Sequence, residues 1–134
     1  MTHDCRRAAR FMTFGLLVLS VMFSTFAHHS KSMYDLDKTI TLEGIITEVD
    51  WGNPHVLFLA DAKQVDSNKG SITSWDLEGP SPNSLESKGV KSDTLKVGDK
   101  VTVTGNPRKD GRPHLLLLGI TDASGKRYVV VESQ

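Results

Sequence analysis

From residue 39 onward, the chain is a succession of strand-length segments separated by turn residues. Apolar and β-branched side chains dominate residues 39–51, 55–61, 71–79, 99–105, 114–121 and 127–131, and several of these segments alternate with polar residues. Alternation of this kind predicts half-buried strands. Glycine, proline and asparagine lie between the segments, where they favour turns. The pattern therefore predicts a fold built mainly from β-strands.

One short helix interrupts the strands. Within residues 81–89, Ser81 is placed to cap a helix, Pro82 suits its first turn and Gly89 suits its end. Three strands, a short helix and further strands follow the chain order of an OB-fold, a small Greek-key barrel. Gly44 in the middle of the first strand predicts a bend. We therefore expect an all-β fold with one short helix, an OB-like Greek-key β-barrel over residues 39–134. An open sandwich of the same strands is the alternative.

The first 27 residues have the pattern of a secretion signal. A head with three arginines precedes the apolar residues 11–26, and Thr25 and Ala27 occupy the small-residue positions of a cleavage site. We expect a signal peptide over residues 1–27 and an N-terminal leader over residues 28–38. An uncleaved anchor is the alternative, because the apolar run has about the minimum length for crossing a membrane.

Charge and cysteine content argue against several classes of function, such as nucleic-acid binding and thiol chemistry. Removing three Arg and one Asp with the signal leaves 13 basic and 15 acidic residues, a net charge of −2. A weakly acidic surface argues against nucleic-acid binding, which needs a basic face. The only cysteine, Cys5, lies in the basic head, so we expect no disulfide, thiol chemistry or lipid anchor in the mature chain. We predict a periplasmic or secreted protein without stable membrane insertion after cleavage.

Several short motifs occur together along the predicted mature chain. They are AHHS (27–30), W-x-N-P-H (51–55), Trp75, SPN (81–83), DTLKVGDKVTVTG (93–105) and KDG (109–111). This combination resembles a family of small secreted bacterial proteins described only as a domain of unknown function. The resemblance implies an exported stand-alone domain without an established activity. The family pattern contains His28, His29, Trp51, Asn53, Pro54 and His55. It lacks His114, and it places a tryptophan where Val90 stands in this chain.

Cleavage after Ala27 would make His28 the first residue of the mature chain. Its terminal amine and imidazole would then be able to chelate one metal ion, with His29 as a further donor. The amine has an ordinary pKa of about 7.7–8.0, so a transition metal can displace its proton near neutral pH. Imidazole nitrogen suits copper, zinc and nickel, and copper binds tightest in the usual order. The sequence thus predicts a site for copper or another divalent transition metal. Two polar residues at a cleavage junction are the simpler alternative.

His55 and His114 are the further candidate metal ligands. Each follows a proline and opens an apolar segment, in PHVLFL and PHLLLL. In an OB-fold, the loops between strands 1 and 2 and between strands 4 and 5 flank one binding face. We therefore expect both histidines at one rim of the barrel. A structural histidine bonded to its turn is the alternative in each case.

The same rim suggests a second class of function. Trp51 and Asn53 together with Arg108 and Arg112 are candidates to hold an anionic or saccharide ligand through stacking and charge. A pure interaction protein that uses exposed strand edges is a third class.

Enzymatic interpretations have little support. The chain contains no G-x-S-x-G, H-E-x-x-H or phosphate-binding glycine motif. Asp76 and Glu78 lie on one face of a predicted strand, where we interpret them as solvent-facing charges, and Trp75 is expected in the core. We therefore predict a binding protein rather than a hydrolytic enzyme.

Overall fold

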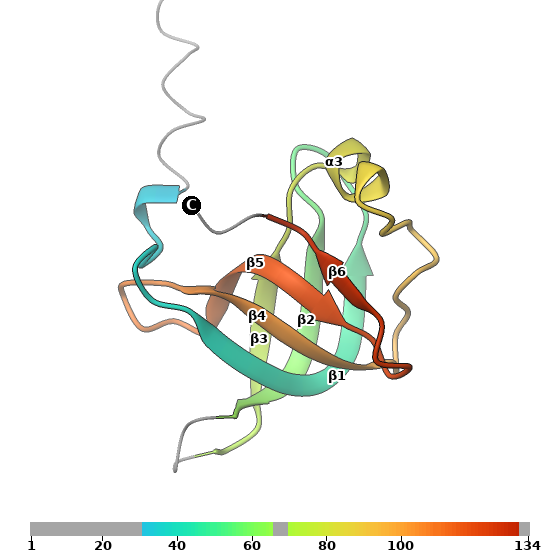
Figure 1. The fold of residues 1–134 in the computed structure, drawn as a ribbon. Coiled ribbons are helices and arrows are strands. Elements are labelled where there is room, and N and C mark those ends of the chain that lie inside the picture. The colour runs from blue at the N-terminus through green and yellow to red at the C-terminus, as the bar shows by residue number, and fades with distance from the viewer. Residues whose placement is uncertain (1–30, 66–69, 132–134) are drawn as a thin grey trace, which may run out of the picture. The chain divides into compact units, whose positions relative to one another are not determined.

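The computed structural model describes residues 31–65 and 70–131. The predicted signal peptide, His28 and His29 lie outside the described residues. The strands and the short helix follow each other in the predicted order (Figure 1). They are β1 (Ile40–Asp50), β2 (Leu57–Gln64), β3 (Thr73–Glu78), α3 (Pro82–Ser87), β4 (Lys100–Pro107), β5 (His114–Thr121) and β6 (Arg127–Val129). Within these residues no helix has the length and hydropathy needed to cross a membrane.

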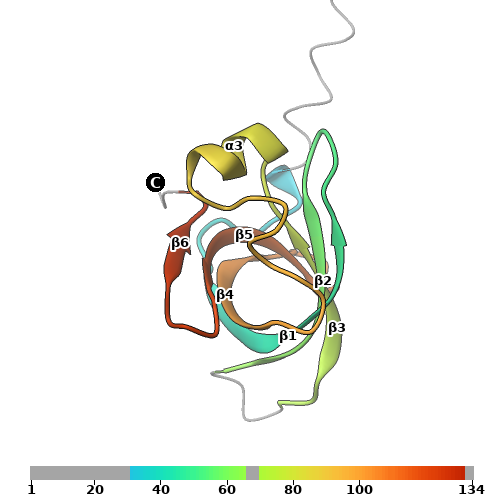
Figure 2. The same ribbon diagram turned by 90° about the vertical axis from the view of Figure 1, so that its right-hand side faces the viewer.

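Five of the strands close into a barrel. The sheet order is β3-β2-β1-β4-β5-β6, and an additional pairing of β3 with β5 joins the two sides. Figure 2 shows the strands curving around a common centre. The closing pair is parallel, whereas the other neighbours are antiparallel. This is the closed Greek-key arrangement of an OB-like barrel, so the fold prediction is confirmed over the open sandwich.

The long strand β1 allows the closure because it pairs on both sides. Residues 42–50 pair with β2, and residues 40–45 pair with β4. Gly44 lies in both ladders, opposite Ala62 and Val101. A Cβ atom on Gly44 would overlap the Asp61 carbonyl oxygen and lie 2.5 Å from the Ala62 Cβ atom. The glycine therefore permits a close approach of β1 and β2 at the tightly curved part of the sheet.

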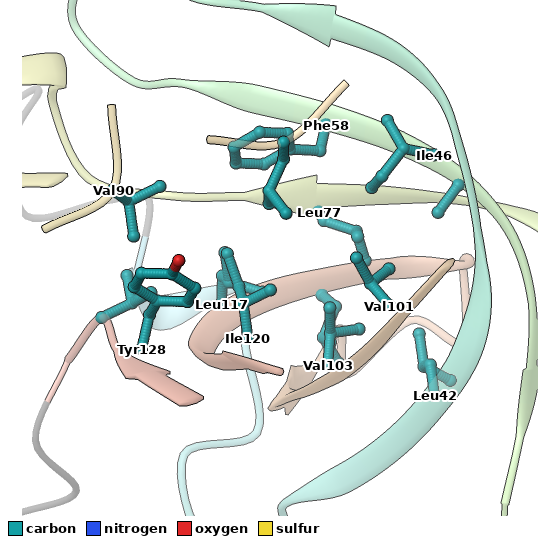
Figure 3. Packing of buried hydrophobic residues seen from close by; sticks show 14 of the residues in the cluster. Leu42, Ile46, Phe58, Leu77, Val90, Val101, Val103, Leu117, Ile120 and Tyr128 are labelled. Atoms are coloured by element: carbon teal, nitrogen blue, oxygen red, sulfur yellow. The ribbon is translucent and has the colours of Figure 1, made fainter. Parts of the chain in front are cut away.

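The core fills the barrel with alternate residues of each strand (Figure 3). Leu42 and Ile46 from β1 lie on the same face as Phe58 from β2 and Leu77 from β3, and all four are buried. The helix α3 adds Leu85, and the loop that follows it adds Val90, which is fully buried. Trp75 is only partly buried and packs against this cluster.

Two segments differ from the sequence prediction. Strand β2 continues to Gln64 rather than ending near residue 61, because Lys63 and Gln64 still have partners on the long β1. The compact unit begins at Met33, before the first strand. Here the Asp35 N–H donates to the Pro107 carbonyl and the Lys109 N–H donates to the Met33 carbonyl. This part of the leader therefore pairs with the end of β4 and the residues that follow it.

Candidate functional site

The carboxylate of Glu78, at the end of β3, contacts side chains from three other parts of the chain. The Glu78 Oε1 atom lies 2.9 Å from Nδ1 of His55. Its Oε2 atom lies 3.3 Å from Nε2 of His114 and accepts a 2.6 Å hydrogen bond from the Tyr34 hydroxyl. We call Tyr34, His55, Glu78 and His114 the rim cluster.

Strand pairing brings these residues together. In the parallel pair of β3 and β5, Asp76 lies opposite His114, and Glu78 is two residues further on the same face of β3. The β1–β2 connection that carries His55 is bonded to the residues after β3. The Val56 N–H donates to the Pro80 carbonyl, and the Gly79 N–H donates to the Val56 carbonyl. The two histidines thus share one end of the barrel, as expected from an OB-fold.

Tyr34 anchors the leader at this end. Tyr34 forms a β-bridge with Arg108, and the residue as a whole is 1% exposed. Its ring meets the His114 ring edge-to-face, with the centroids 5.6 Å apart. Burial, followed by the hydrogen bond to Glu78, raises the pKa of the Tyr34 hydroxyl above its ordinary range. This hydroxyl therefore keeps its proton at physiological pH and donates a hydrogen bond to Glu78.

Glu78 is ionised in this setting. The hydrogen bond with His114 lowers the pKa of Glu78, and the Tyr34 hydroxyl lowers it further, while burial acts in the opposite direction. The Glu78 side chain is only 16% exposed. An ionised carboxylate with little access to water needs donors at both oxygens, and the rim cluster supplies them.

The two histidines differ in access. His114 lies between two carboxylates, because its Nδ1 atom faces Asp76 at 3.7 Å and its Nε2 atom faces Glu78. The His55 side chain is 44% exposed and contacts Glu78 through Nδ1. Within the residues that the structure describes, no group of three or more His, Cys, Asp or Glu side chains has the arrangement of a metal site.

The two arginines of the β4–β5 connection both contact one aspartate. Arg108 donates through Nε and Nη2 to the Asp110 carboxylate, with the Nη2–Oδ2 distance at 2.8 Å. The Arg112 Nε atom lies 3.5 Å from the same carboxylate, and the Arg112 backbone N–H also donates to it. These contacts, led by the Arg108 hydrogen bond, lower the pKa of Asp110 to about 2. Part of the positive charge at this rim is thus balanced within the loop.

Trp51 and Asn53 lie in the β1–β2 connection with different surroundings. Trp51 is partly buried, packs against the core and meets the Phe58 ring edge-to-face at a centroid distance of 6.4 Å. Asn53 is exposed. The Trp51 ring therefore covers part of the core, which limits the face it can offer for stacking on a ligand.

Comparison with known protein families identifies the chain. Residues 16–117 match the model of a family of unknown function (DUF6152). The chain belongs to this family. The DUF6152 match includes all four residues of the rim cluster, and it also includes His28 and His29. No curated protein and no solved structure matches the chain.

Two members of the rim cluster, Tyr34 and Glu78, were not predicted from the sequence. Glu78 was interpreted as a solvent-facing charge, which the structure contradicts, and Tyr34 was assigned to a leader outside the barrel. Asp76, by contrast, is half exposed. The only sequence signal for Glu78 was its place two residues from Asp76 on a strand that pairs with the one His114 opens. This spacing indicates a contact between Glu78 and His114 only when the pairing of β3 with β5 is known.

Proposed function

We propose that this DUF6152 protein is an exported protein that binds one divalent transition-metal ion, with copper preferred. In this proposal, the nitrogen ligands are the imidazole of His55 and the histidines at the mature N-terminus. The observation that carries the proposal is the 2.9 Å contact between Nδ1 of the exposed His55 and the Glu78 carboxylate. Metal-binding histidines typically hold a carboxylate with the ring nitrogen that does not touch the metal.

The chemistry of the donors supports a transition metal rather than calcium or magnesium. Imidazole nitrogen suits copper, zinc and nickel, whereas the harder cations prefer sets of oxygen ligands. A single exposed imidazole binds weakly, so a useful site needs more nitrogen donors. His28 and His29 are the candidates, and their share in the proposal rests on the sequence alone.

The length of the leader is compatible with this proposal. Six peptide steps separate His28 from Tyr34, and an extended chain of that length covers at most about 22 Å. Tyr34 is itself bonded to Glu78, which contacts His55. The proposal therefore relies on the short sequence distance between His28 and Tyr34.

The alternative ligand, an anion or a saccharide at Trp51, Asn53, Arg108 and Arg112, has less support. Asp110 already pairs with both arginines, and Trp51 packs on the core. We therefore retain the metal ion as the proposed ligand.

Calorimetric titration with Cu(II) tests the contribution of His55. In mature protein beginning at His28, His55→Ala is expected to weaken binding at least tenfold, because one nitrogen ligand is lost. Arg112→Ala is the control at the same rim, since the exposed Arg112 side chain contacts Asp110 and no member of the rim cluster. It is expected to leave the affinity within about twofold. Unchanged affinity in His55→Ala, with the fold verified by circular dichroism, would reject His55 as a ligand.

A further inference from the structure

The rim cluster raises the question of which His55 nitrogen is free for a ligand. We propose that Glu78 is a positioning residue that holds His55 in the tautomer with its proton on Nδ1, so that Nε2 is the metal-binding atom. This inference deepens the proposed function, because it names the ligating atom. Its first part, the tautomer, holds whether or not a metal binds.

The proton assignment follows from the acceptor. An ionised carboxylate has no proton to donate, so a ring nitrogen at hydrogen-bond distance must supply one. The contact of 2.9 Å between His55 Nδ1 and Glu78 Oε1 is a normal length for such a bond. A neutral imidazole carries only one N–H, and the other nitrogen keeps its lone pair. In His55 that lone pair is on Nε2.

The Glu78 carboxylate can determine which His55 nitrogen carries the proton because other contacts fix the orientation of the carboxylate. Its second oxygen accepts from the Tyr34 hydroxyl at 2.6 Å and lies 3.3 Å from His114 Nε2. Tyr34 is buried and fixed by the backbone pairing of the leader. Turning the carboxylate away from His55 would break these contacts in a site with little water. The orientation of the exposed His55 ring is thus set by a largely buried partner.

The same geometry separates the two histidines by role. His114 places one ring nitrogen against each of two carboxylates, Asp76 and Glu78. His55 touches a single carboxylate and is the more exposed of the two rings. We therefore assign His55 to the metal and His114 to the support of Glu78.

Nitrogen-15 NMR of the histidine rings tests the tautomer directly. In metal-free protein at mildly alkaline pH, His55 is expected to show a protonated Nδ1 and an unprotonated Nε2. Zinc(II), used as a diamagnetic probe, is expected to shift the Nε2 resonance and to leave the Nδ1 proton in place. A proton on Nε2 in the metal-free protein, or zinc at Nδ1, would overturn the proposal.

A pair of isosteric variants separates the role of Glu78 from general effects on the rim. Glu78→Gln introduces an amide that can accept or donate, so the His55 tautomers are expected to mix and the Zn(II) affinity to fall by about ten- to a hundredfold. Asp76→Asn alters only the contact with His114, and it is expected to change neither quantity. An unchanged His55 tautomer in folded Glu78→Gln would refute the positioning role. If that variant does not fold, the spectrum of the native protein decides the question.

If the predicted tautomer is observed but no metal binds, the proposed function fails while the role of Glu78 stands. If metal binds and His55 has the other tautomer, the proposed function stands and this inference fails. The two are therefore distinguishable in one set of spectra.

Discussion

At the scale of single residues, the charges of the β4–β5 connection are largely satisfied within it. Asp110 accepts hydrogen bonds from the Arg108 guanidinium and from the backbone of Arg112. Arg108 is the less exposed of the two arginines, because its side chain is mostly covered whereas that of Arg112 is exposed. An incoming anion would therefore compete with Asp110 for Arg108.

The titration of Asp110 measures this arrangement. Its pKa is expected at about 2, and Arg108→Ala is expected to raise it toward the ordinary value of 3.8. Arg112→Ala is the matched control and is expected to have a smaller effect, because the backbone N–H donor remains. Since the folded-state pKa is lowered, the stabilising contribution is present above pH 3.8 and is lost as the pH falls through about 2. NMR of the side-chain carboxyl carbon gives the midpoint, and an ordinary midpoint in the native protein would contradict the account.

For single residues, the sequence predicted the place in the barrel better than it predicted the residues in contact. His55 and His114 were expected at one end of the barrel because strand order alone determines which loops meet. Glu78 was misassigned because alternation indicates the face of a strand but not what covers that face. Its partner Tyr34 is 44 residues away in the chain and reaches it through a pairing of the leader that no local pattern indicates.

At the scale of elements, β1 is the strand on which barrel closure depends. It carries a register irregularity between Ile46 and Glu48, and it curves from one neighbour to the other (Figure 1). Gly44 lies where both neighbours pair with it, and Ala62 opposite is also small. Small residues at this point allow the strands to approach without a clash.

We expect Gly44→Ala to destabilise the fold by about 1–3 kcal/mol, the usual effect of overpacking. The added methyl group would overlap backbone atoms of Asp61 and Ala62, which have little freedom to move. Gly52→Ala is the matched control, because its added methyl group would meet only the flexible Asp50 side chain, at 3.3 Å. Urea denaturation gives both free energies of unfolding. Equal stabilities of the two variants would show that the close approach at Gly44 does not constrain the fold.

Element types were predictable because alternation and helix caps are local signals. Strand β5 and the short helix were predicted well, since Pro113 precedes the strand, Ser81 is the N-cap residue of the helix and Pro82 begins it. The predicted end of β2 was wrong because Lys63 and Gln64 are polar. Their strand conformation comes from pairing with β1. Tertiary pairing rather than local preference thus determined this boundary.

At the scale of the whole barrel, closure through β3 and β5 makes a site from distant segments. It brings the end of β3, the start of β5 and the β1–β2 connection to one rim, and the leader joins them through Tyr34. The central claim of the proposed function is that a histidine held by a carboxylate at that rim binds a metal ion together with the histidines of the proposed mature N-terminus.

Titration of Cu(II) into mature protein with a free or an acetylated N-terminus tests this claim most directly. The starting residue, His28, is first verified by N-terminal sequencing of the exported protein. We predict one Cu(II) ion per chain, and an affinity that acetylation lowers by roughly ten- to a hundredfold, equivalent to about 1.5–3 kcal/mol for one lost nitrogen ligand. Equal affinity of the free and acetylated proteins, or no Cu(II) binding by either, would contradict the account.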